Sequence, residues 1–195
     1  GVLSSKIQFF RTNQKVELTL PKIINKVLLE EHAGEGKLPD TYVAELNNAV
    51  IFSNTELMIV NDIVLYDEFD QEKIGIYTPK ALNIIGISEK NITINVPRAL
   101  PQIIKEGIHF TKDHSANYYH WLIECLPRLA LITELDKNLP LLVKGDLLPQ
   151  FFEVLKVVNS DNRPIVKLEN TSCYLVEKLY YPSCLSRVAD NYGKP

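Results

Sequence analysis

The second half of the chain alternates between short apolar runs and longer amphipathic segments, and this order limits the folds that it can adopt. Four apolar runs predict β-strands: Gly107–Phe110, Pro140–Val143, Ile165–Leu168 and Tyr174–Tyr181. Two segments between them, Asn117–Leu135 and Leu147–Val158, have the apolar spacing of helices. Strands that alternate with helices are typical of a parallel sheet. We therefore expect residues 107–195 to form a small Rossmann-like α/β part.

The first half follows the pattern of antiparallel hairpins, in which apolar or alternating runs are separated by turn-forming residues. The expected strands are Tyr42–Leu46, Ala49–Phe52, Leu57–Val60 and Ile63–Tyr66, with weaker ones at Gly75–Tyr77 and Ile92–Val96. The predicted turns are Asn47-Asn48, Ser53-Asn54 and Asn61-Asp62. A β-hairpin meander over residues 41–97 would give this part of the chain an α+β character.

Residues 1–40 carry weaker signals. Val16–Leu20 alternates like a strand and is followed by Pro21. Ile23–Glu31 has the pattern of a short helix, which a turn at Gly34-Glu35-Gly36 would end. A chain of 195 residues suits one domain of ordinary size. We expect the β-rich segment 1–106 and the α/β part 107–195 to pack as one compact domain.

Composition narrows the classes of function. A net charge of −3 without a basic block argues against a nucleic-acid surface. No run approaches the roughly 20 apolar residues that a transmembrane helix needs, and the first residues do not resemble a signal peptide. Three widely separated cysteines suggest neither a disulfide framework nor a zinc site. We expect a cytoplasmic protein, at most peripheral at the inner face of the membrane.

The predicted helix at Asn117–Leu135 separates into a broad apolar face and a narrow polar stripe, when its residues are placed at the helical period. The apolar face consists of Tyr118, Tyr119, Leu122, Ile123, Leu126, Leu129 and Ala130. The polar stripe consists of Asn117, His120, Glu124 and Arg128, with Trp121 at its edge. Residues three and four apart are neighbours on a helix, so the polar side chains form a row. An amide, an imidazole, a carboxylate and a guanidinium in one row indicate a site.

The same run resembles the signature of an enzyme family. Asn-Tyr-Tyr-His-Trp-Leu-x-Glu-x-Leu-Pro-Arg-Leu, from Asn117 to Leu129, is similar to the motif of the glycosyltransferase 61 family. Bacterial capsular-polysaccharide transferases and plant xylosyl- and arabinosyltransferases belong to that family. The resemblance implies the N-terminal, acceptor-side domain of a GT-B type enzyme. Its implied reaction transfers a sugar, with inversion, from a nucleotide sugar to a glycan hydroxyl in capsular or surface polysaccharide synthesis.

The resemblance also implies what the chain lacks and what it binds. A second Rossmann-like domain with the donor site would follow Pro195, and residues 1–195 alone would be inactive or nearly so. No metal cofactor is expected, because enzymes of this type stabilise the donor diphosphate with side chains and helix N-termini. The expected partners are a glycan acceptor, a nucleotide sugar and the donor-binding domain.

His120 and Glu124 are the candidate catalytic residues. They stand at positions i and i+4 of the predicted helix, so their side chains can touch. A carboxylate beside an imidazole orients the ring and stabilises its charged form, which suits a general base. Either residue could remove the proton from the acceptor hydroxyl; we slightly favour Glu124, with His120 orienting it or contacting the sugar. Asn117 would cap the helix or bind an acceptor hydroxyl.

Four further residues are candidates for substrate binding. Asp113 and His114 lie in a loop at the carboxyl end of a predicted strand, where open α/β sheets bind ligands. Trp121 would stack on a sugar or lie in the core. Arg128 would form an ion pair with Glu124 or contact a donor phosphate. Pro127 should kink the helix, because it removes one backbone hydrogen bond.

Other interpretations stay open. A non-catalytic α/β module that binds a glycan or a protein would use the polar stripe only as a structural network. A hydrolase with Glu124 and Asp113 as its carboxylate pair would need a separation of roughly 5 to 10 Å. The acidic run Asp67-Glu68-Phe69-Asp70 has the wrong spacing for a metal motif and is interpreted as a solvated turn.

Overall fold

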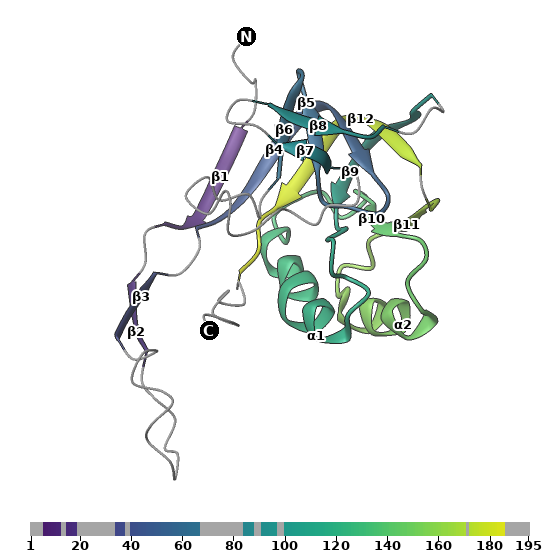
Figure 1. Ribbon diagram of the computed structural model, residues 1–195. Helices are drawn as coiled ribbons and strands as arrows, with labels where there is room; N and C mark the ends of the chain where they lie inside the picture. The colour runs from purple at the N-terminus through teal and green to yellow at the C-terminus, as the bar shows by residue number, and fades with distance from the viewer. Residues whose placement is uncertain are drawn as a thin grey trace.

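The protein is a mixed α/β structure built around one large sheet with few helices (Figure 1). The computed structural model describes residues 6–12, 15–18, 34–37, 40–66, 84–87, 91–96, 100–170 and 172–185. Within these ranges the main sheet has eight strands. Parallel and antiparallel pairs both occur in it, so the expected combination of hairpins and an α/β part is confirmed at the level of fold class.

Four neighbouring strands of the sheet are parallel, in the order β11-β10-β9-β12. Their bounds are Gln102–His109 for β9, Leu141–Lys144 for β10, Ile165–Leu168 for β11 and Cys173–Pro182 for β12. All four were expected, but β9 begins five residues before Gly107. The sequence pattern thus changes at residue 107 inside a strand. The start of β9 was not predicted because it is exposed and lacks an apolar run.

The antiparallel strands continue the same sheet on the other side of β12. They are β4 (Thr41–Phe52), β5 (Met58–Val60) and β6 (Ile63–Leu65), and β1 (Lys6–Arg11) also pairs with β4. The hairpin turn at Asn61-Asp62 is confirmed, and both residues have positive φ. The turn predicted at Asn47-Asn48 is wrong, because β4 continues through it. Pairing with β12 holds these residues in the strand, although Asn48 has a φ of 53°.

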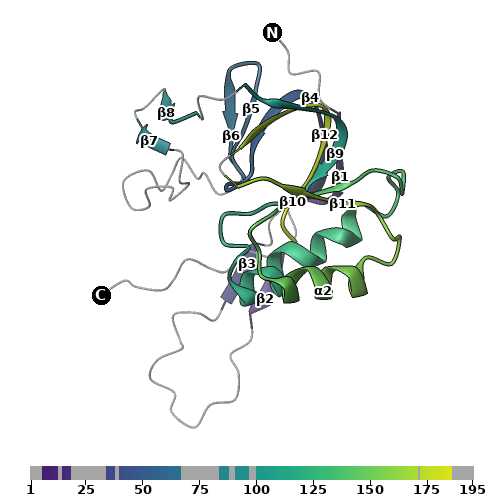
Figure 2. The same cartoon turned by 90° about the vertical axis from the view of Figure 1, so that its right-hand side faces the viewer.

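The sheet changes direction at Asn47 and Asn48 of β4. In β4 the side chains that face one core cluster change from Ala44 and Leu46 to Ala49 and Ile51. The paired strand β12 changes face at the same place. Val176 and Leu179 both face this cluster, although two residues rather than one separate them in the sequence. A left-handed asparagine in one strand permits such a change of face. Figure 2 shows the sheet curling around this interior.

Two small hairpins stand outside the main sheet. The strands are β2 (Lys15–Leu18) with β3 (Gly34–Lys37), and β7 (Ile84–Ile87) with β8 (Ile92–Ile94). The turn predicted at Gly34-Glu35-Gly36 is therefore wrong: these residues pair with β2 as a strand. The predictions for Thr19 and Leu20, Ile23–Glu31, Asp67–Asp70 and Gly75–Tyr77 lie outside the described residues.

The helix predicted from Asn117 to Leu135 is shorter and less regular than expected. It consists of α1 (Tyr118–His120), the π-helical turn η4 (Trp121–Cys125) and the 3-10 segment η5 (Leu126–Leu131). The amide of Leu126 donates to the carbonyl of Trp121, five residues earlier. Pro127 follows in the first turn of η5, where its missing amide is tolerated. The kink predicted at Pro127 stays a prediction; next to this residue the helix changes from the π-helical turn to the 3-10 segment.

A second helix, α2 (Pro149–Val158), matches the prediction closely. Both helical segments pack on the face of the sheet opposite to the curled interior (Figure 2). Alternate residues of β10 point to opposite faces of the sheet. Leu141 and Val143 belong to the core cluster on the helix side, and Leu142 belongs to the cluster in the curled interior. On the helix side of the sheet, Arg163 donates hydrogen bonds to the carbonyls of Ile132, Leu135 and Asp136.

Candidate functional site

In the first half of the helix over residues 118–131, the side chains that the sequence assigns to the buried face are exposed. Its most buried side chains are Trp121, Glu124, Cys125, Leu126, Arg128 and Leu131. Those of Tyr118, Tyr119, Leu122 and Ile123 are 37–55% exposed. The predicted side is wrong for these four residues, whereas Leu126 is buried and Leu129 packs against the core as predicted. The π-helical and 3-10 turns also depart from the regular helical period that the prediction assumed. The physical reason for the exposure of those four lies in Arg128 and Trp121, whose side chains make hydrogen bonds and ring contacts when they are packed against the sheet.

Arg128 belongs to the core. Its side chain is fully buried, and its Nε and Nη2 donate to the carbonyls of Pro182 and His109 over 2.8 and 3.1 Å. The guanidinium also lies over the rings of Phe110 and Tyr181. No ion pair joins it to Glu124, although both residues are in the described part of the chain. The predicted ion pair is absent, and burial leaves no surface for a donor phosphate.

Trp121 is also a core residue. Its ring is fully buried between Phe110 and Phe151, with edge-to-face contacts at centroid distances of 6.1 and 5.7 Å. Such contacts stabilise the packing of the helix on the sheet and on α2. A sugar at the surface cannot reach this ring. The alternative of a core position therefore holds for Trp121, and the role of sugar platform does not fit it.

His120 and Glu124 form the pair that the sequence predicts. The Nδ1 atom of His120 lies 2.9 Å from Oε2 of Glu124, and the exposed fractions of the two side chains are 25% and 7%. The carboxylate is thus on the inner side of the pair and the imidazole at the rim. A proton on Nδ1 directed at Glu124 leaves the lone pair on Nε2, the nitrogen that Glu124 does not engage. This arrangement can accept a proton from a hydroxyl group.

The residues before the helix position this pair. Asn117 caps the helix: its Oδ1 accepts from the amide of Tyr119 over 2.9 Å. Both oxygens of Asp113 also accept protein hydrogen bonds, from the amide of Glu56 at 2.9 Å and the hydroxyl of Tyr66 at 2.6 Å. Asp113 therefore ties its loop to the hairpin region. A carboxylate engaged in this way does not suit the acid of a hydrolase.

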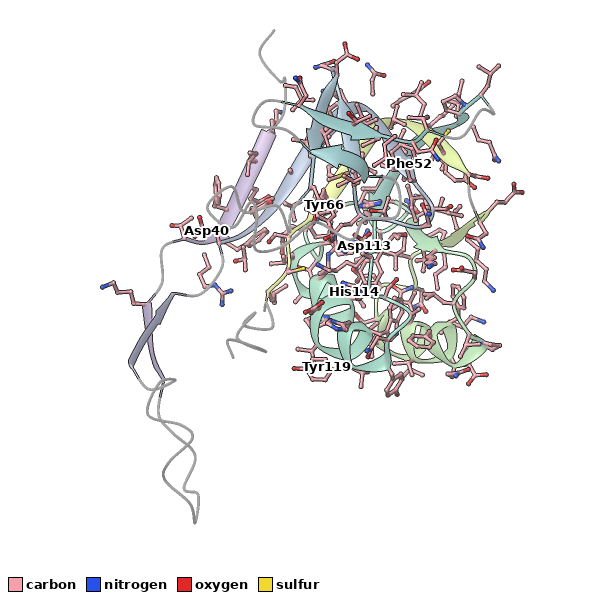
Figure 3. All side chains as sticks on the ribbon, in the orientation of Figure 1. Asp40, Phe52, Tyr66, Asp113, His114 and Tyr119 are labelled. Atoms are coloured by element: carbon pink, nitrogen blue, oxygen red, sulfur yellow. The ribbon has the colours of Figure 1, made fainter. Side chains whose placement is uncertain are left out.

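Exposed rings surround the imidazole of His120. The ring centroids of His114 and Tyr119 lie 5.3 and 5.6 Å from that of His120. Figure 3 shows His114 between Asp113 and Tyr119 along this side of the molecule, with Tyr119 at the edge. The sequence assigned Tyr119 to the buried apolar face and so missed it. Its position next to His120 was the available signal.

The structure also contains a buried polar cluster that sequence reasoning missed. Lys112 forms an ion pair with Glu56 at 3.1 Å and donates to the sulfur of Cys184 at 2.9 Å. His109 is fully buried, and desolvation, followed by the charges of Arg128 and Lys112, lowers its pKa to about 3. His109 ends β9 and Lys112 follows it, at the carboxyl end of a strand, which is where polar side chains of a site gather in open α/β sheets.

Comparison with protein-family models, curated proteins and solved structures gives no match for this chain. In the ranges that the structure describes, no helix has the length and apolar character needed to cross a membrane. The same ranges hold no group of three His, Cys, Asp or Glu side chains arranged for a metal ion.

Proposed function

We propose that the protein is the acceptor-side domain of an inverting glycosyltransferase that moves a sugar from a nucleotide sugar to a glycan hydroxyl. The observation that carries this proposal is the pair His120 and Glu124, with Nδ1 and Oε2 at 2.9 Å. It lies within the run from Asn117 to Leu129 that resembles the glycosyltransferase 61 motif. A parallel sheet in the order β11-β10-β9-β12 with helices on one face is compatible with a Rossmann-like half of a GT-B enzyme.

In the proposed reaction His120 is the general base. The acceptor hydroxyl gives its proton to Nε2 as its oxygen attacks the anomeric carbon, and the bond to the nucleotide diphosphate breaks. Glu124 holds the ring in the correct tautomer and stabilises the imidazolium that forms. The exposures of 25% and 7% favour this assignment over Glu124 as the base, because the buried carboxylate is less accessible to an acceptor. The resemblance implies that the donor binds on a separate donor-binding domain.

The test uses the full-length protein with UDP-, GDP- and CMP-sugars and a set of oligosaccharide acceptors. Released nucleotide and product mass are measured. His120→Ala should lower kcat by about 10²- to 10⁴-fold, the usual contribution of general base catalysis. Glu124→Gln should lower kcat as well, because the amide cannot stabilise an imidazolium. Melting temperatures of both variants should stay close to that of the wild type.

Glu153→Gln is the matched control, since Glu153 is an exposed carboxylate on α2. It should transfer sugar at the wild-type rate. Full activity of His120→Ala would contradict the proposal. Loss of folding in His120→Ala and Glu124→Gln would instead favour a non-catalytic module in which the pair is structural.

A further inference from the structure

The proposed reaction needs a surface that holds the acceptor beside His120. We propose that the ring of Tyr119 is this surface: a platform on which the acceptor glycan lays the apolar face of one sugar ring. The inference rests on the proposed function and adds to it the element that positions the substrate. It replaces Trp121 in the role of aromatic platform, because Trp121 is fully buried.

Tyr119 is the exposed aromatic ring next to the base. Its side chain is 55% exposed, and its ring meets that of His120 edge to face at 5.6 Å and 86°. The edge-to-face geometry sets the plane of the tyrosine ring nearly perpendicular to the imidazole. Because the two rings are in contact, a sugar that stacks on the tyrosine would lie close to His120. Figure 3 shows Tyr119 at the outer edge of the helix, where a large ligand has access.

The preceding tyrosine serves a different purpose. Tyr118 is also about half exposed, but its ring packs edge to face on Phe151 of α2 at 5.7 Å. It therefore contributes to the contact between the two helical segments. Among the described residues the ring contact of Tyr119 is with His120 alone. Of the two neighbouring tyrosines, Tyr119 is the one placed to receive a ligand.

The chemistry around the ring suits a saccharide. One face of a pyranose carries C–H groups, whose partial positive charge is attracted to the negative face of an aromatic ring. The edge of a sugar carries hydroxyl groups that need hydrogen-bond partners. His114 is exposed and its ring lies 5.3 Å from His120, so imidazole nitrogens are available beside the platform. An apolar peptide would make no use of these groups.

The test measures binding without a donor, so that it does not depend on turnover. Full-length protein is titrated calorimetrically with cellotetraose, xylotetraose, chitotetraose and maltotetraose. The wild type should bind at least one of them. Tyr119→Leu should weaken that binding about 10-fold, whereas Tyr119→Phe should keep it, since the phenyl ring preserves the stacking face. Binding by none of the four at millimolar concentration would overturn the inference.

Ile123→Ala is the control, because Ile123 is 42% exposed on the same side of the helix but carries no ring. It should bind the tetrasaccharide as the wild type does. Equal losses for Ile123→Ala and Tyr119→Leu would show general apolar docking and overturn the platform.

With an active enzyme, Tyr119→Leu should raise KM for the acceptor and leave kcat nearly unchanged, whereas His120→Ala lowers kcat. Failure of the proposed function would show as glycan binding without transfer by the wild type. Failure of the platform alone would show as transfer with an unchanged KM in Tyr119→Leu.

Discussion

Acidification should destabilise the fold through His109, and the size of the effect follows from its burial. The side chain is fully buried, neither ring nitrogen has a hydrogen-bond partner in the described part of the chain, and Arg128 and Lys112 add positive charge nearby. Desolvation is the largest cause and, with those charges, lowers the pKa of His109 from 6.5 to about 3. In the folded protein the imidazole therefore stays neutral over a range in which the unfolded chain protonates it.

The sign and the magnitude follow from proton linkage. Between pH 6.5 and pH 3 the unfolded state binds one more proton at this residue than the folded state does. Stability therefore falls as the pH falls, by about 1.4 kcal/mol per pH unit. At pH 4.5 the contribution of His109 alone is a loss of about 3 kcal/mol relative to pH 7.5. That is a large part of the roughly 5 to 15 kcal/mol that stabilises an ordinary domain.

Urea unfolding at pH 7.5, 6.5, 5.5 and 4.5 measures this contribution when the wild type is compared with His109→Phe. The phenyl ring keeps the packing against Tyr181 and cannot be protonated. The variant should lose less stability on acidification, and the difference between the two proteins should change by about 3 kcal/mol between pH 7.5 and pH 4.5. Ile108→Val, at a neighbouring buried position, should lower stability at all pH values and keep the wild-type slope. Parallel curves for His109→Phe and the wild type would refute the reasoning.

Two further predictions concern close contacts and buried charge, both measured by urea unfolding. A Cβ atom at Gly145 would collide with the backbone carbonyl of Leu168, so Gly145→Ala should lower the free energy of unfolding by about 2 kcal/mol. Gly86→Ala is the control and should lower it little, because the nearest contact of a Cβ atom there is at 3.6 Å. Equal losses in the two variants would contradict the packing at Gly145. Lys112→Met removes the ammonium group that pairs with the buried carboxylate of Glu56 and should cost about 3 to 5 kcal/mol. Adding Glu56→Gln should recover a large part of that loss, and no recovery would mean that the pair is not coupled.

Strand positions were largely predictable, because apolar runs and turn residues report burial directly. The four parallel strands and α2 were found from such runs. The failures have a common cause in long-range pairing. Asn47-Asn48 has the composition of a turn, but β12 pairs with β4 on both sides of it and keeps the strand continuous. A local pattern carries no information about a partner more than a hundred residues away.

The site was predictable in its members but less so in their roles. The contact between His120 and Glu124 follows from helical spacing alone, as does the cap at Asn117. The partners of Asp113 do not, because Glu56 and Tyr66 reach it from the hairpin region across long sequence separations. The exposure of Tyr119 was missed for another reason. A prediction from the sequence pattern assigns a tyrosine among apolar neighbours to the core. Tyr119 is exposed because the other face of the helix, with Trp121 and Arg128, packs on the sheet.

The orientation of that face explains why the pair of His120 and Glu124 has its observed form. The carbonyls of His109 and Pro182 lie near the carboxyl ends of β9 and β12, and Arg128 donates to both. Unpaired carbonyls in a buried position are costly, so the contact draws the arginine side of the helix to the sheet. Glu124, one turn earlier, is carried inward with it. His120, one turn earlier again, reaches the rim. The result is a buried carboxylate in contact with a partly exposed imidazole.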